Sequence, residues 1–596
     1  MSYTAPVPDI TFALNEIAGM REAIADGLFG DLSEDLAQAV LEEAGRFAAS
    51  EIAPLQRIGD TNGARFENGK VVLPKEWGEV FRKWAEGGWA GLPCPVEHGG
   101  QGLPTMVSMA VHEMWHSGSV AFALGPVLTH GAVEALEAHG SRHLQDTYMP
   151  PLISGQWTAT MNLTEPQSGS DLNSLRSKAV PQGDGSYKIS GTKIFITYGE
   201  HDMAENIVHL VLARLPDAPP GTRGISLFLV PKFLVNEDGS LGRRNDVKCT
   251  GLEHKLGIHG SPTCVMTYGD DEGGAIGWLI GEENAGLACM FTMMNNARLS
   301  VGIQAVALAE AATQHAIAYA HERRQGRKPG AGRGDDMVPI VEHPDVRRML
   351  LSMRARTLAC RMICYAAAGA IDRARYGKEE GARAAAKMRA DLLTPLAKAY
   401  CSDSAVEVAS LGVQVHGGMG YIEETGAAQF FRDSRIAPIY EGTNGIQAID
   451  LVTRKLPMGG GEAVRAFIGE MAQTAREASA LNRAEFGQMG ARLAEAVGAL
   501  EEATGFIASL AGGDISGALA VATPYLRLMA TTAGGAYLAR AALAGATGEG
   551  DATAQAHIAL ARYFAENHLP ETAALRQIVM QGAASLLDAP DIALPV

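Results

Sequence analysis

The stretch YKISGTKIFIT (187–197) alternates between apolar and polar residues and follows a turn signal, Gly-Asp-Gly, at 183–185. Alternation with a period of two is typical of a strand that is buried on one face. Three further strand candidates are separated from one another by clusters of glycine, proline and aspartate: NIVHLVLARL (206–215), GISLFLVPKFL (224–234) and PTCVMTYGD (262–270). The sequence therefore predicts a compact β domain of roughly 120 residues.

The chain on both sides of this β domain has helical periodicity. Upstream, DLSEDLAQAVLEEAGRFAASEIAPL (31–55) carries apolar residues at spacings of three and four, which predicts a helix that ends at Pro54. Downstream, LPMGGGE (456–462) is typical of a linker between helical segments. We expect four domains: a helical domain at 1–155, the β domain at 156–283, a helical bundle at 284–455 and a helical extension at 456–596.

The composition is that of a globular protein. Of the 596 residues, 47% are hydrophobic and 20% charged, and the net charge of −17 argues against a general nucleic-acid binder. The seven cysteines are scattered, which is typical of a reducing cytoplasm. Cys360 and Cys364 lie one helical turn apart, a spacing that more often reflects packing than a metal site. The sequence predicts neither a signal peptide nor a membrane span.

Two segments could bind a ligand. MNLTEPQSGSDLNS (161–174) offers hydroxyl groups and accessible backbone N–H groups, which suit an anionic or carbonyl-rich ligand, although a polar connector is the alternative. Within this region Glu165 and Asp171 are interpreted as solvated acids or turn formers, and Lys193 as an outward strand residue. The predicted amphipathic helix 297–327 carries several arginines, which indicates either phosphate recognition or ordinary surface charge. His416 is interpreted as a polar-loop histidine.

IYEGTNGIQ (439–447) places a glutamate after two bulky apolar residues and before a glycine-rich loop. Glu441 could be an ordinary loop acid or a base held in a nearly dry pocket, and local pattern leaves both open. The sequence contains neither a dinucleotide-binding glycine fingerprint after a strand nor a Walker loop. From composition and pattern alone, the prediction stops at a multidomain cytoplasmic enzyme.

Taken in order, these segments resemble the acyl-CoA dehydrogenase family. The resemblance rests on six motifs in register: TEPQSGSD (164–171), GTKIFITYG (191–199), NNARLSVG (295–302), ERRQGR (322–327), QVHGGMGY (414–421) and IYEGTNGIQAID (439–450). It implies a mainly α fold with a central β domain, made of an N-terminal helical domain, a β-barrel-like domain and a C-terminal four-helix bundle, here followed by a helical extension.

The resemblance also implies a bound FAD between the β domain and the helical bundle. The flavin would contact Met161, Leu163, Thr164, Gly169, Ser170, Phe195 and Thr197. The adenosine diphosphate half would be held across a subunit interface by Arg323, Gln325, Gln414 and Gly418, and Thr443 would also contact the cofactor. The substrate would contact Ser170, Arg298, Tyr440 and Gly442. The chain departs from the family pattern at Asn295, where an acidic partner of Arg298 is usual, and at Gly326-Arg327.

Glu441 falls at the family's usual position for the catalytic base, and Ala297 at the alternative position cannot accept a proton. The implied reaction is α,β-dehydrogenation of an acyl-CoA to the trans-2-enoyl-CoA, with electron-transfer flavoprotein as electron acceptor and a homodimer as the assembly. The length and N-terminus resemble a long bacterial subgroup, which implies 3-(methylthio)propanoyl-CoA or another short or medium acyl-CoA. A flavin-containing nucleic-acid-binding stress protein and an acyl-CoA oxidase are the alternatives.

The extension bears on the first alternative. Residues 461–596 contain eight arginines, no lysine and fourteen acids, so that their net charge is 8 − 14 = −6. Such a charge favours neither a phosphate backbone nor an anionic lipid surface. We expect the extension to pack against the bundle and to shape the dimer.

Overall fold

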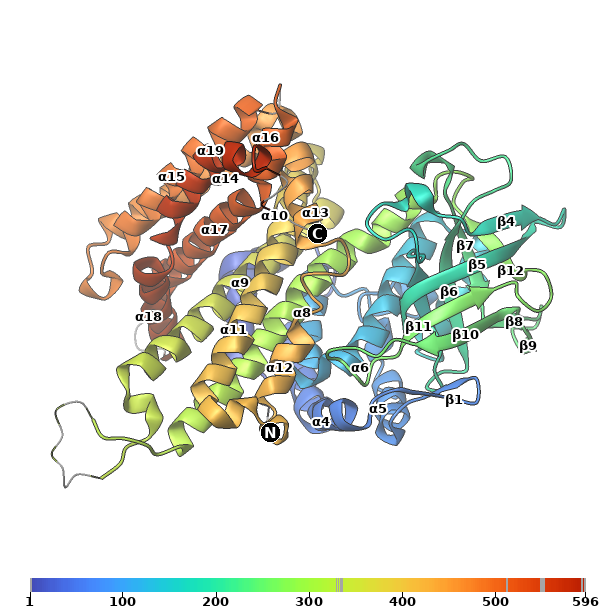
Figure 1. Ribbon diagram of the computed structural model, residues 1–596, viewed down its shortest axis with the longest axis horizontal. Coiled ribbons are helices and arrows are strands. Elements are labelled where there is room, and N and C mark those ends of the chain that lie inside the picture. Colours follow the sequence, from blue (N-terminus) through green and yellow to red (C-terminus); the bar gives the residue numbers. More distant parts are fainter. Residues whose placement is uncertain are drawn as a thin grey trace. The chain divides into compact units, whose positions relative to one another are not determined.

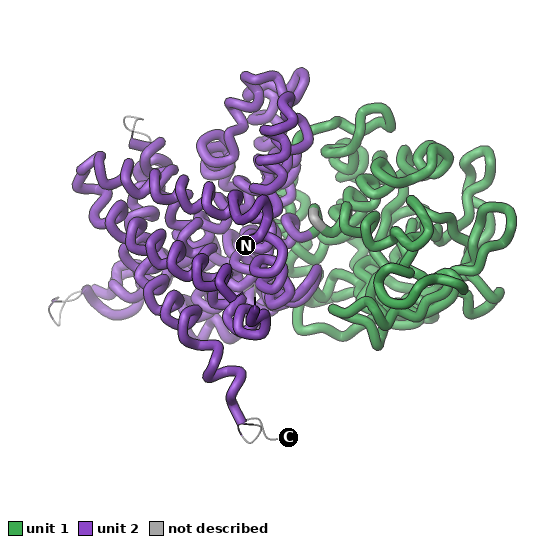
Figure 2. The backbone as a smooth tube through the Cα atoms, turned by 90° about the horizontal axis from the view of Figure 1, so that it is seen from above, with its two compact units in different colours: residues 1–2, 46–104, 114–297 green, residues 3–45, 105–113, 298–596 purple. Residues whose placement is uncertain are grey.

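The computed structural model describes residues 3–328, 330, 332, 336–510, 513–546, 552–590 and 593. The chain divides into two compact units, coloured green and purple in Figure 2. Unit 1 comprises residues 46–104 and 114–297 together with the first two residues, and unit 2 comprises residues 3–45, 105–113 and 298–596. Both units are interleaved in sequence, because the N-terminal segment belongs with the C-terminal half.

Unit 1 is built around an eight-stranded sheet with the order β10-β11-β5-β12-β7-β6-β3, and β4 pairs with β5 beside this path (Figure 1). Its strands are β3 (Trp157–Asn162), β4 (Lys178–Pro181), β5 (Ser186–Thr197), β6 (Asn206–Ala213), β7 (Ser226–Pro231), β10 (Val247–Leu252), β11 (Thr263–Tyr268) and β12 (Ala275–Ile280). Two small hairpins, β1 (Arg65–Glu67) with β2 (Lys70–Val72) and β8 (Phe233–Val235) with β9 (Leu241–Arg244), stand apart from it. The strands predicted from the sequence are confirmed.

The central strands of this sheet are buried on both faces. Every residue of β6 and of β7 is buried, which explains why their sequences are nearly continuous apolar runs rather than alternating ones. Strand β5, in contrast, is buried at positions 186, 189, 193 and 196 and partly buried or exposed at the others. β3 runs parallel to β6, with Met161 opposite Leu210, whereas the other pairs are antiparallel.

The helices of unit 1 are α4 (Ala53–Asn62), α5 (Lys75–Glu86), most of α6 (Thr105–His139), α7 (Arg142–Ile153) and the start of α8 (Gly286–Glu322). The core joins them to the sheet: Tyr148 and Leu152 of α7 belong to the same buried cluster as Trp157 of β3 and Leu210 of β6. Burial of these large apolar side chains is the main stabilising contribution to such a unit.

Unit 2 is helical. It contains the N-terminal helices α1 (Val7–Ala13), α2 (Met20–Ala25) and α3 (Glu34–Phe47), and the bundle helices α8, α9 (Pro344–Tyr376), α10 (Glu380–Pro395) and α11 (Cys401–His416). A π-helical turn, η8 (Leu396–Tyr400), joins α10 to α11, and α12 (Ala427–Ser434) and α13 (Asn444–Asp450) follow. Residues 299–313 of α8 are buried without interruption, so that this helix is central rather than amphipathic.

The extension is part of the same unit as the bundle. Its helices are α14 (Glu462–Ala480), α15 (Met489–Leu510), α16 (Ile515–Ala520), α17 (Ala522–Gly545), α18 (Ala552–Asn567) and α19 (Glu571–Leu587). Helices α17 and α18 pack against α9, and α14 packs against α10. The predicted packing of the extension on the bundle is confirmed.

The mainly α fold with a central β domain is also confirmed, whereas the four domain boundaries stay a prediction.

The predicted helix end at Pro54 is wrong. A π-helical turn (Ala48–Ile52) continues α3 into α4, and Pro54 stands in the first turn of α4. Proline is tolerated there because the first N–H groups of a helix have no intrahelical acceptor.

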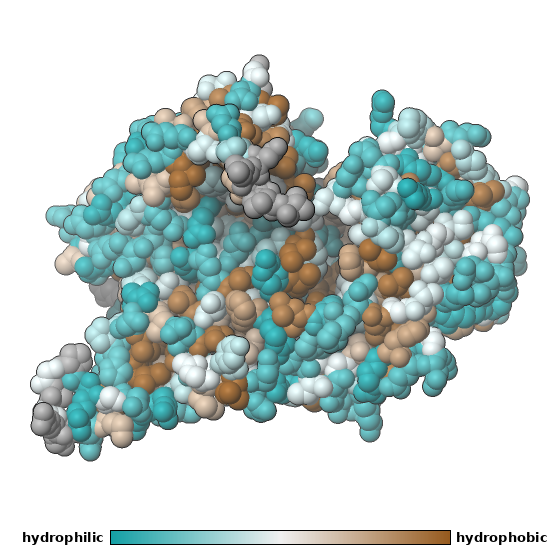
Figure 3. Space-filling view, in the orientation of Figure 1, coloured by the Kyte–Doolittle hydropathy of each residue, from teal (hydrophilic) through white to brown (hydrophobic). Residues whose placement is uncertain are grey.

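Among the described helices, α6 is the one whose length and composition would let it cross a membrane. Within its most apolar window 78% of the residues are buried inside the fold, as in the core helix of a soluble protein. The face of the molecule seen in Figure 3 is mainly hydrophilic, with small hydrophobic patches.

Candidate active site

The turn that carries Glu441 lies in unit 2, between α12 and α13. Glu441 and Gly442 both have left-handed backbones, with φ of 56° and 84°. This conformation is uncommon for a residue with a Cβ, and such strain is concentrated at functional sites. Thr443 caps α13, because its hydroxyl oxygen accepts a hydrogen bond from the Ile446 N–H at 3.3 Å. The start of a helix thus holds the turn from its C-terminal side.

The backbone of this turn is also fastened from within α13. Gln447 is buried, and its Nε2 donates long hydrogen bonds to the carbonyl oxygens of Glu441 and Gly442, at 3.5 and 3.4 Å. A Cβ at position 442 would lie 2.9 Å from that same Nε2. The close approach and the positive φ together require glycine at this position.

The Glu441 carboxyl group is partly buried and has two cations as electrostatic neighbours, Arg298 of α8 and Lys398 of η8. Burial raises the pKa of Glu441, and the positive charges of Arg298 and Lys398 oppose this rise. A carboxylate with a raised pKa accepts a proton more readily. Its burial and its two cationic neighbours distinguish Glu441 from a solvated loop acid, and its role as a base stays a prediction.

Two charged residues near this turn were missed by sequence reasoning. Lys398 is fully buried, and its Nζ donates to Asn444 Oδ1 at 2.9 Å. Asp450 of α13 places a carboxylate oxygen 3.9 Å from Arg298 Nη1. Asp450 thus supplies a carboxylate near Arg298, while the side chain of Asn295 lies outside the described part of the chain. No local pattern could have found these partners, because they come from segments far apart in sequence.

Tyr440 lies next to the base and is fixed by α8. Its hydroxyl donates a hydrogen bond to Oε1 of the buried Gln304. Burial raises the pKa of the Tyr440 hydroxyl, with the charge of Glu441 adding to the shift, so that the phenol remains a donor. The ring therefore has a defined position beside Glu441.

The residues assigned to the adenosine half of the cofactor lie in two exposed segments of unit 2. Arg323 and Gln325 follow α8, and this segment pairs with residues 338–340: the Ile340 N–H donates to the Arg323 carbonyl at 2.8 Å, and the Gln325 N–H to the Val338 carbonyl at 3.0 Å. Gln414 and Gly418 are exposed at the end of α11.

Aromatic stacking joins these two segments. The His416 ring lies 4.6 Å from that of His315 and 4.3 Å from that of Tyr319, both near the end of α8. The interpretation of His416 as a polar-loop residue is wrong, since it is buried in the last turn of α11 and its Nδ1 lies 2.7 Å from the Gly412 carbonyl oxygen. His416 therefore packs the end of α11 against the last turns of α8.

In unit 1, the loop that follows β3 is organised by a buried carboxylate. Glu165 Oε1 accepts hydrogen bonds from Lys193 Nζ at 2.9 Å and from the Ser177 hydroxyl at 2.6 Å, and Oε2 accepts from the Arg176 N–H at 2.7 Å. Lys193 is fully buried and also donates to the Leu163 carbonyl at 3.0 Å. The interpretations of Glu165 as solvated and of Lys193 as outward-facing are wrong, because both side chains are buried and form an ion pair with each other.

Phe195 owes its exposure to a β-bulge. The register between β5 and β11 shifts between Cys264 and Met266, so that Ile194 and Phe195 oppose a single residue of β11. Phe195 has a φ of 61° and is 58% exposed, although it is a large apolar residue. The Ile194 N–H donates to the Thr164 carbonyl at 2.9 Å, which holds the loop beside this bulge.

These features fit the flavin that the family resemblance implies. Phe195 is exposed, and Met161, Leu163, Thr164 and Thr197 are partly buried. In the described part of the chain, the N–H groups of Gly169 and Ser170 have no acceptor within the protein. Exposed aromatic surface and free N–H donors in this region suit a flat ring system with carbonyl and nitrogen acceptors.

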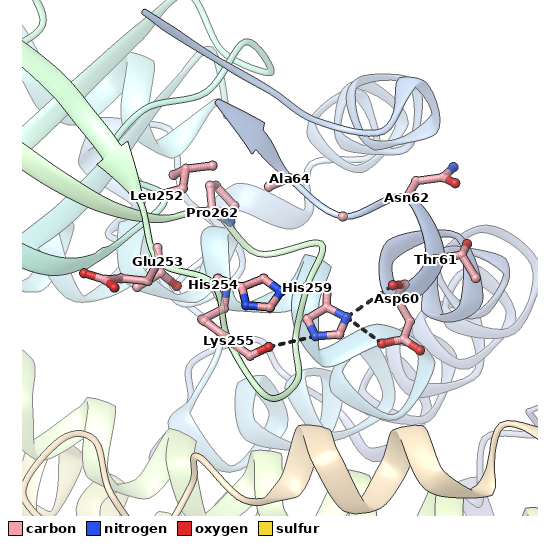
Figure 4. Close-up of a pocket in the computed structure, with 12 residues that line it drawn as sticks. Asp60, Thr61, Asn62, Ala64, Leu252, Glu253, His254, Lys255, His259 and Pro262 are labelled. Atoms are coloured by element: carbon pink, nitrogen blue, oxygen red, sulfur yellow. Dashed lines mark hydrogen bonds and ion pairs between the residues drawn. The ribbon is translucent and has the colours of Figure 1, made fainter. Parts of the chain in front are cut away.

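A separate pocket of about 200 Å³ lies in unit 1, between the end of α4 and the β10–β11 loop (Figure 4). His259 closes one side of it: Nδ1 lies 3.0 Å from Asp60 Oδ1, and Nε2 lies 2.9 Å from the Lys255 carbonyl oxygen. None of the predicted site residues belongs to its lining. The described residues also contain no cluster of histidine, cysteine, aspartate or glutamate suited to a metal ion.

The predicted site residues are thus gathered into two groups. The seven flavin residues, from Met161 to Thr197, lie around the β3 loop and the β5 bulge of unit 1, and all the others lie in unit 2. Within unit 2, the structure brings Arg298, Tyr440, Glu441, Gly442 and Thr443 together around the base-bearing turn. The roles given to these residues stay predictions.

Models of known protein families match most of the chain. Family models for the acyl-CoA dehydrogenase N-terminal, middle and C-terminal domains match residues 34–156, 160–270 and 284–456. A fourth model, described as acetyl-CoA dehydrogenase C-terminal like, matches residues 467–590 of the extension.

Full-length relatives agree with these matches. The chain is 50% identical over 593 residues to 3-methylmercaptopropionyl-CoA dehydrogenase of Ruegeria pomeroyi, covering 99% of this chain and 100% of the relative. It is 33% identical to the broad-specificity linear acyl-CoA dehydrogenase FadE5 of Mycobacterium tuberculosis, with 97% of each chain covered. The fold matches Caenorhabditis elegans ACDH-11, solved in complex with C11-CoA, with a TM-score of 0.76 at 22% identity over 97% of this chain and 96% of that one. The chain belongs to the acyl-CoA dehydrogenase family of FAD-dependent oxidoreductases.

Proposed function

We propose that this acyl-CoA dehydrogenase converts 3-(methylthio)propanoyl-CoA, or a closely related short acyl-CoA, to the trans-2-enoyl-CoA, with Glu441 as the base that removes the α proton. The observation that carries the assignment of the base is the left-handed, partly buried turn that sets Glu441 near two cations. The choice of substrate is supported by the 50% identity to the Ruegeria pomeroyi relative over nearly the whole chain.

The α C–H bond of a thioester is a weak acid, so that its deprotonation needs both a base and help for the negative charge that develops on the carbonyl oxygen. Glu441 supplies the base. In the described part of the chain, the Glu441 N–H has no acceptor within the protein, which leaves it available to donate to the thioester carbonyl. Gly442 adds no side chain beside this N–H, so that a thioester can approach the backbone closely.

Bound FAD supplies the acceptor for the hydride that leaves the β carbon. Of the residues in unit 1, Met161, Leu163 and Phe195 would offer apolar contact, while Thr164, Gly169, Ser170 and Thr197 would offer hydroxyl and N–H donors. Of the residues in unit 2, Arg323, Gln325, Gln414, Gly418 and Thr443 would bind the adenosine diphosphate half of a cofactor and its surroundings. Arg298, Ser170, Tyr440 and Gly442 would contact the substrate.

The proposal extends to partners. An electron-transfer flavoprotein would accept the electrons, as in the flavoprotein-linked members of the family. A homodimer would complete the adenosine site, because Arg323 and Gln414 are exposed in each chain and accessible to a second one. A cytoplasmic location is supported by the seven cysteines, all of which are buried free thiols.

The base is tested by Glu441→Gln. The amide keeps the size of the side chain but cannot take a proton, so that turnover should fall by about 100- to 10,000-fold while the purified protein keeps its flavin absorbance. Glu424→Gln is the matched control, because Glu424 is an exposed acid close in sequence. A Glu441→Gln variant that retains near-normal turnover would rule out this base.

The substrate is tested by anaerobic flavin bleaching with a panel of acyl-CoA thioesters. We expect the fastest bleaching with 3-(methylthio)propanoyl-CoA and slower bleaching as the acyl chain lengthens. Faster bleaching with a long-chain thioester would contradict the proposed substrate class. Release of hydrogen peroxide in step with turnover in air would instead identify an acyl-CoA oxidase.

A further inference from the structure

Lys398 is a buried cation that the reaction described above does not use. It lies in η8, the π-helical turn between α10 and α11, and its side chain is fully buried. Its ammonium group has three N–H donors, of which one is directed at Asn444 Oδ1, 2.9 Å away. Burying an ammonium group is unfavourable unless charge or hydrogen bonds compensate for the lost water. The burial of this charge therefore has to be compensated by groups around it.

Asn444 ties Lys398 to the base-bearing turn. It is the first residue of α13 and lies three positions after Glu441. Its Nδ2 lies 2.8 Å from Asp403 Oδ1, 3.0 Å from Ser402 Oγ and 3.1 Å from the Ala399 carbonyl oxygen. The amide is thus oriented by three acceptors, so that its oxygen faces Lys398. The ammonium group and the turn are held in a fixed relation.

The charges around Lys398 point to Glu441. In the described part of the chain, the charged groups that act on Lys398 are Glu441, Asp403 and Arg298. Burial lowers the pKa of Lys398 to about 8, with Glu441 and Asp403 opposing this shift and Arg298 adding to it. Lys398 is therefore a cation at neutral pH, although its charge is easily lost. Asp403 is bound to the amide nitrogen of Asn444 rather than to the ammonium group.

Arg298 is the other cation near Glu441, and its charge lowers the pKa of Glu441 more strongly than that of Lys398 does. Asp450 lies 3.9 Å from Arg298 and carries the opposite charge. Lys398 has a neutral amide as its hydrogen-bond partner. Asp450 is shared, because it also lies 3.4 Å from Arg454, and Lys398 interacts with both Glu441 and Asp403, so that both cations act on the carboxylate at 441.

We propose that Lys398 is a positioning residue for proton abstraction: its ammonium group, held by Asn444, keeps Glu441 ionised and in place in the resting enzyme. This inference rests on Glu441 being the base. Without the charge of Lys398, Glu441 takes up its proton at a higher pH and, once protonated, cannot accept the α proton. At higher pH the carboxylate re-forms, and the reaction recovers.

The test is the pH dependence of anaerobic flavin bleaching by a saturating acyl-CoA, measured on the FAD-loaded enzyme. Lys398→Gln removes the charge and keeps a donor for Asn444, whereas Lys398→Met removes both. We expect both variants to move the acidic limb of the profile up by about one pH unit, which makes bleaching about tenfold slower on that limb. The rate on the alkaline plateau should stay within about threefold of the wild-type rate, and Lys398→Arg should restore the original limb.

Lys387→Met is the matched control. Lys387 lies on α10, is 68% exposed, and pairs with Asp391, so that its removal changes the net charge equally without acting on the turn. If the acidic limb does not move in Lys398→Gln, the inference is overturned. A loss of plateau rate in Lys398→Met alone would show that Lys398 acts only as a structural tie to Asn444. Should Lys398→Met fail to fold, Lys398→Gln and Lys398→Arg still decide the question.

The failure of this inference can be told apart from the failure of the proposed function. If Glu441→Gln is inactive and Lys398→Gln has the wild-type profile, Glu441 is the base and Lys398 does not position it. If Glu441→Gln remains active, the assignment of the base fails, and the role of Lys398 fails with it.

Discussion

Lys193 and Glu165 form an ion pair inside unit 1, with Nζ 2.9 Å from Oε1 and side chains that are 0% and 3% exposed. The pair lies beneath the loop that carries the predicted flavin contacts. Burial alone would raise the pKa of Glu165, but the charge of Lys193 and the hydrogen bonds from Ser177 and Arg176 outweigh it and lower this pKa to about 2. The loop is therefore held by a carboxylate that stays ionised.

Lys193→Met should loosen this loop. It leaves the Glu165 carboxylate buried without its cation, a change that destabilises proteins by about 3–5 kcal/mol. We expect a lower thermal midpoint for the apoprotein and weaker binding of FAD, measured by calorimetry and by fluorescence titration. Lys178→Met, a substitution of an exposed lysine on β4, is the control. Unchanged FAD affinity in a folded Lys193→Met variant would contradict the role given to the pair.

Gly442→Ala should impair both stability and turnover. A Cβ at φ 84° is strained by about 1–2 kcal/mol, and it would lie 2.9 Å from Gln447 Nε2. Displacing the turn by even 1 Å moves Glu441 from its reactive position, so that turnover should fall by about 100-fold. Steady-state kinetics and thermal unfolding measure the two effects.

Gly445→Ala is the matched control for that substitution. Gly445 lies three residues further on and is exposed, and a Cβ there would meet only Thr443 Oγ1, at 3.8 Å. Its turnover should remain close to that of the wild type. Equal losses in the two variants would mean that the glycines act through general destabilisation of α13 and not through the conformation at 442.

Gly420→Ala and Gly418→Ala should separate a glycine needed by the fold from one needed by a ligand. A Cβ at 420 would lie 2.2 Å from the Val413 carbonyl oxygen, whereas one at 418 would meet nothing within 4 Å. Overpacking of the first kind destabilises by about 1–3 kcal/mol, so that Gly420→Ala should lower the thermal midpoint.

Gly418→Ala should leave the thermal midpoint of the apoprotein unchanged. If the cofactor approaches this backbone as proposed, FAD should bind about tenfold more weakly, equivalent to about 1.4 kcal/mol. Fluorescence titration of the apoprotein provides the measurement. Wild-type affinity in Gly418→Ala would remove Gly418 from the cofactor site.

Asp9 should make the protein sensitive to acid. This residue of α1 contacts α9 through Arg354 Nη2, at 3.2 Å, and α18 through His557 Nε2, at 2.9 Å. Burial works to raise the pKa of Asp9, but the hydrogen bond from His557 and the charges of Arg361 and Arg354 hold it well below its ordinary value of 3.8. Because folding lowers this pKa, the ionised carboxylate stabilises the protein at pH values above the pKa of the unfolded state. This stabilisation is lost as the pH falls below about 3.8.

Asp9→Asn should therefore lower the free energy of unfolding by about 1.5–3 kcal/mol at neutral pH and weaken its decline as the pH falls below about 3.8. Thermal unfolding at a series of pH values measures both effects. Asp31→Asn, at an exposed position before α3, should change neither. Parallel pH profiles for the wild type and Asp9→Asn would show that Asp9 does not contribute to acid lability.

The sequence by itself determined the order of the blocks and pointed to the turn that carries Glu441. The apolar and polar pattern in 187–197 predicted β5 to within one residue, although its buried positions are spaced three and four apart rather than two. The six motifs led to the family and to Glu441, since they preserve residue types at the spacings that the family shares. These features are local, or are repeated in relatives, and so they can be read from a linear chain.

The tertiary structure alone decided which charges lie inside. Alternation along β5 identified two faces but did not show that Lys193 faces inward to meet Glu165, 28 residues earlier in the chain. In the same way, Lys398 meets Asn444 across 46 residues, and Asp450 reaches Arg298 from another helix. The burial and the partner of a charge depend on how distant segments pack, and the pKa of each group follows from that packing rather than from its neighbours in the sequence.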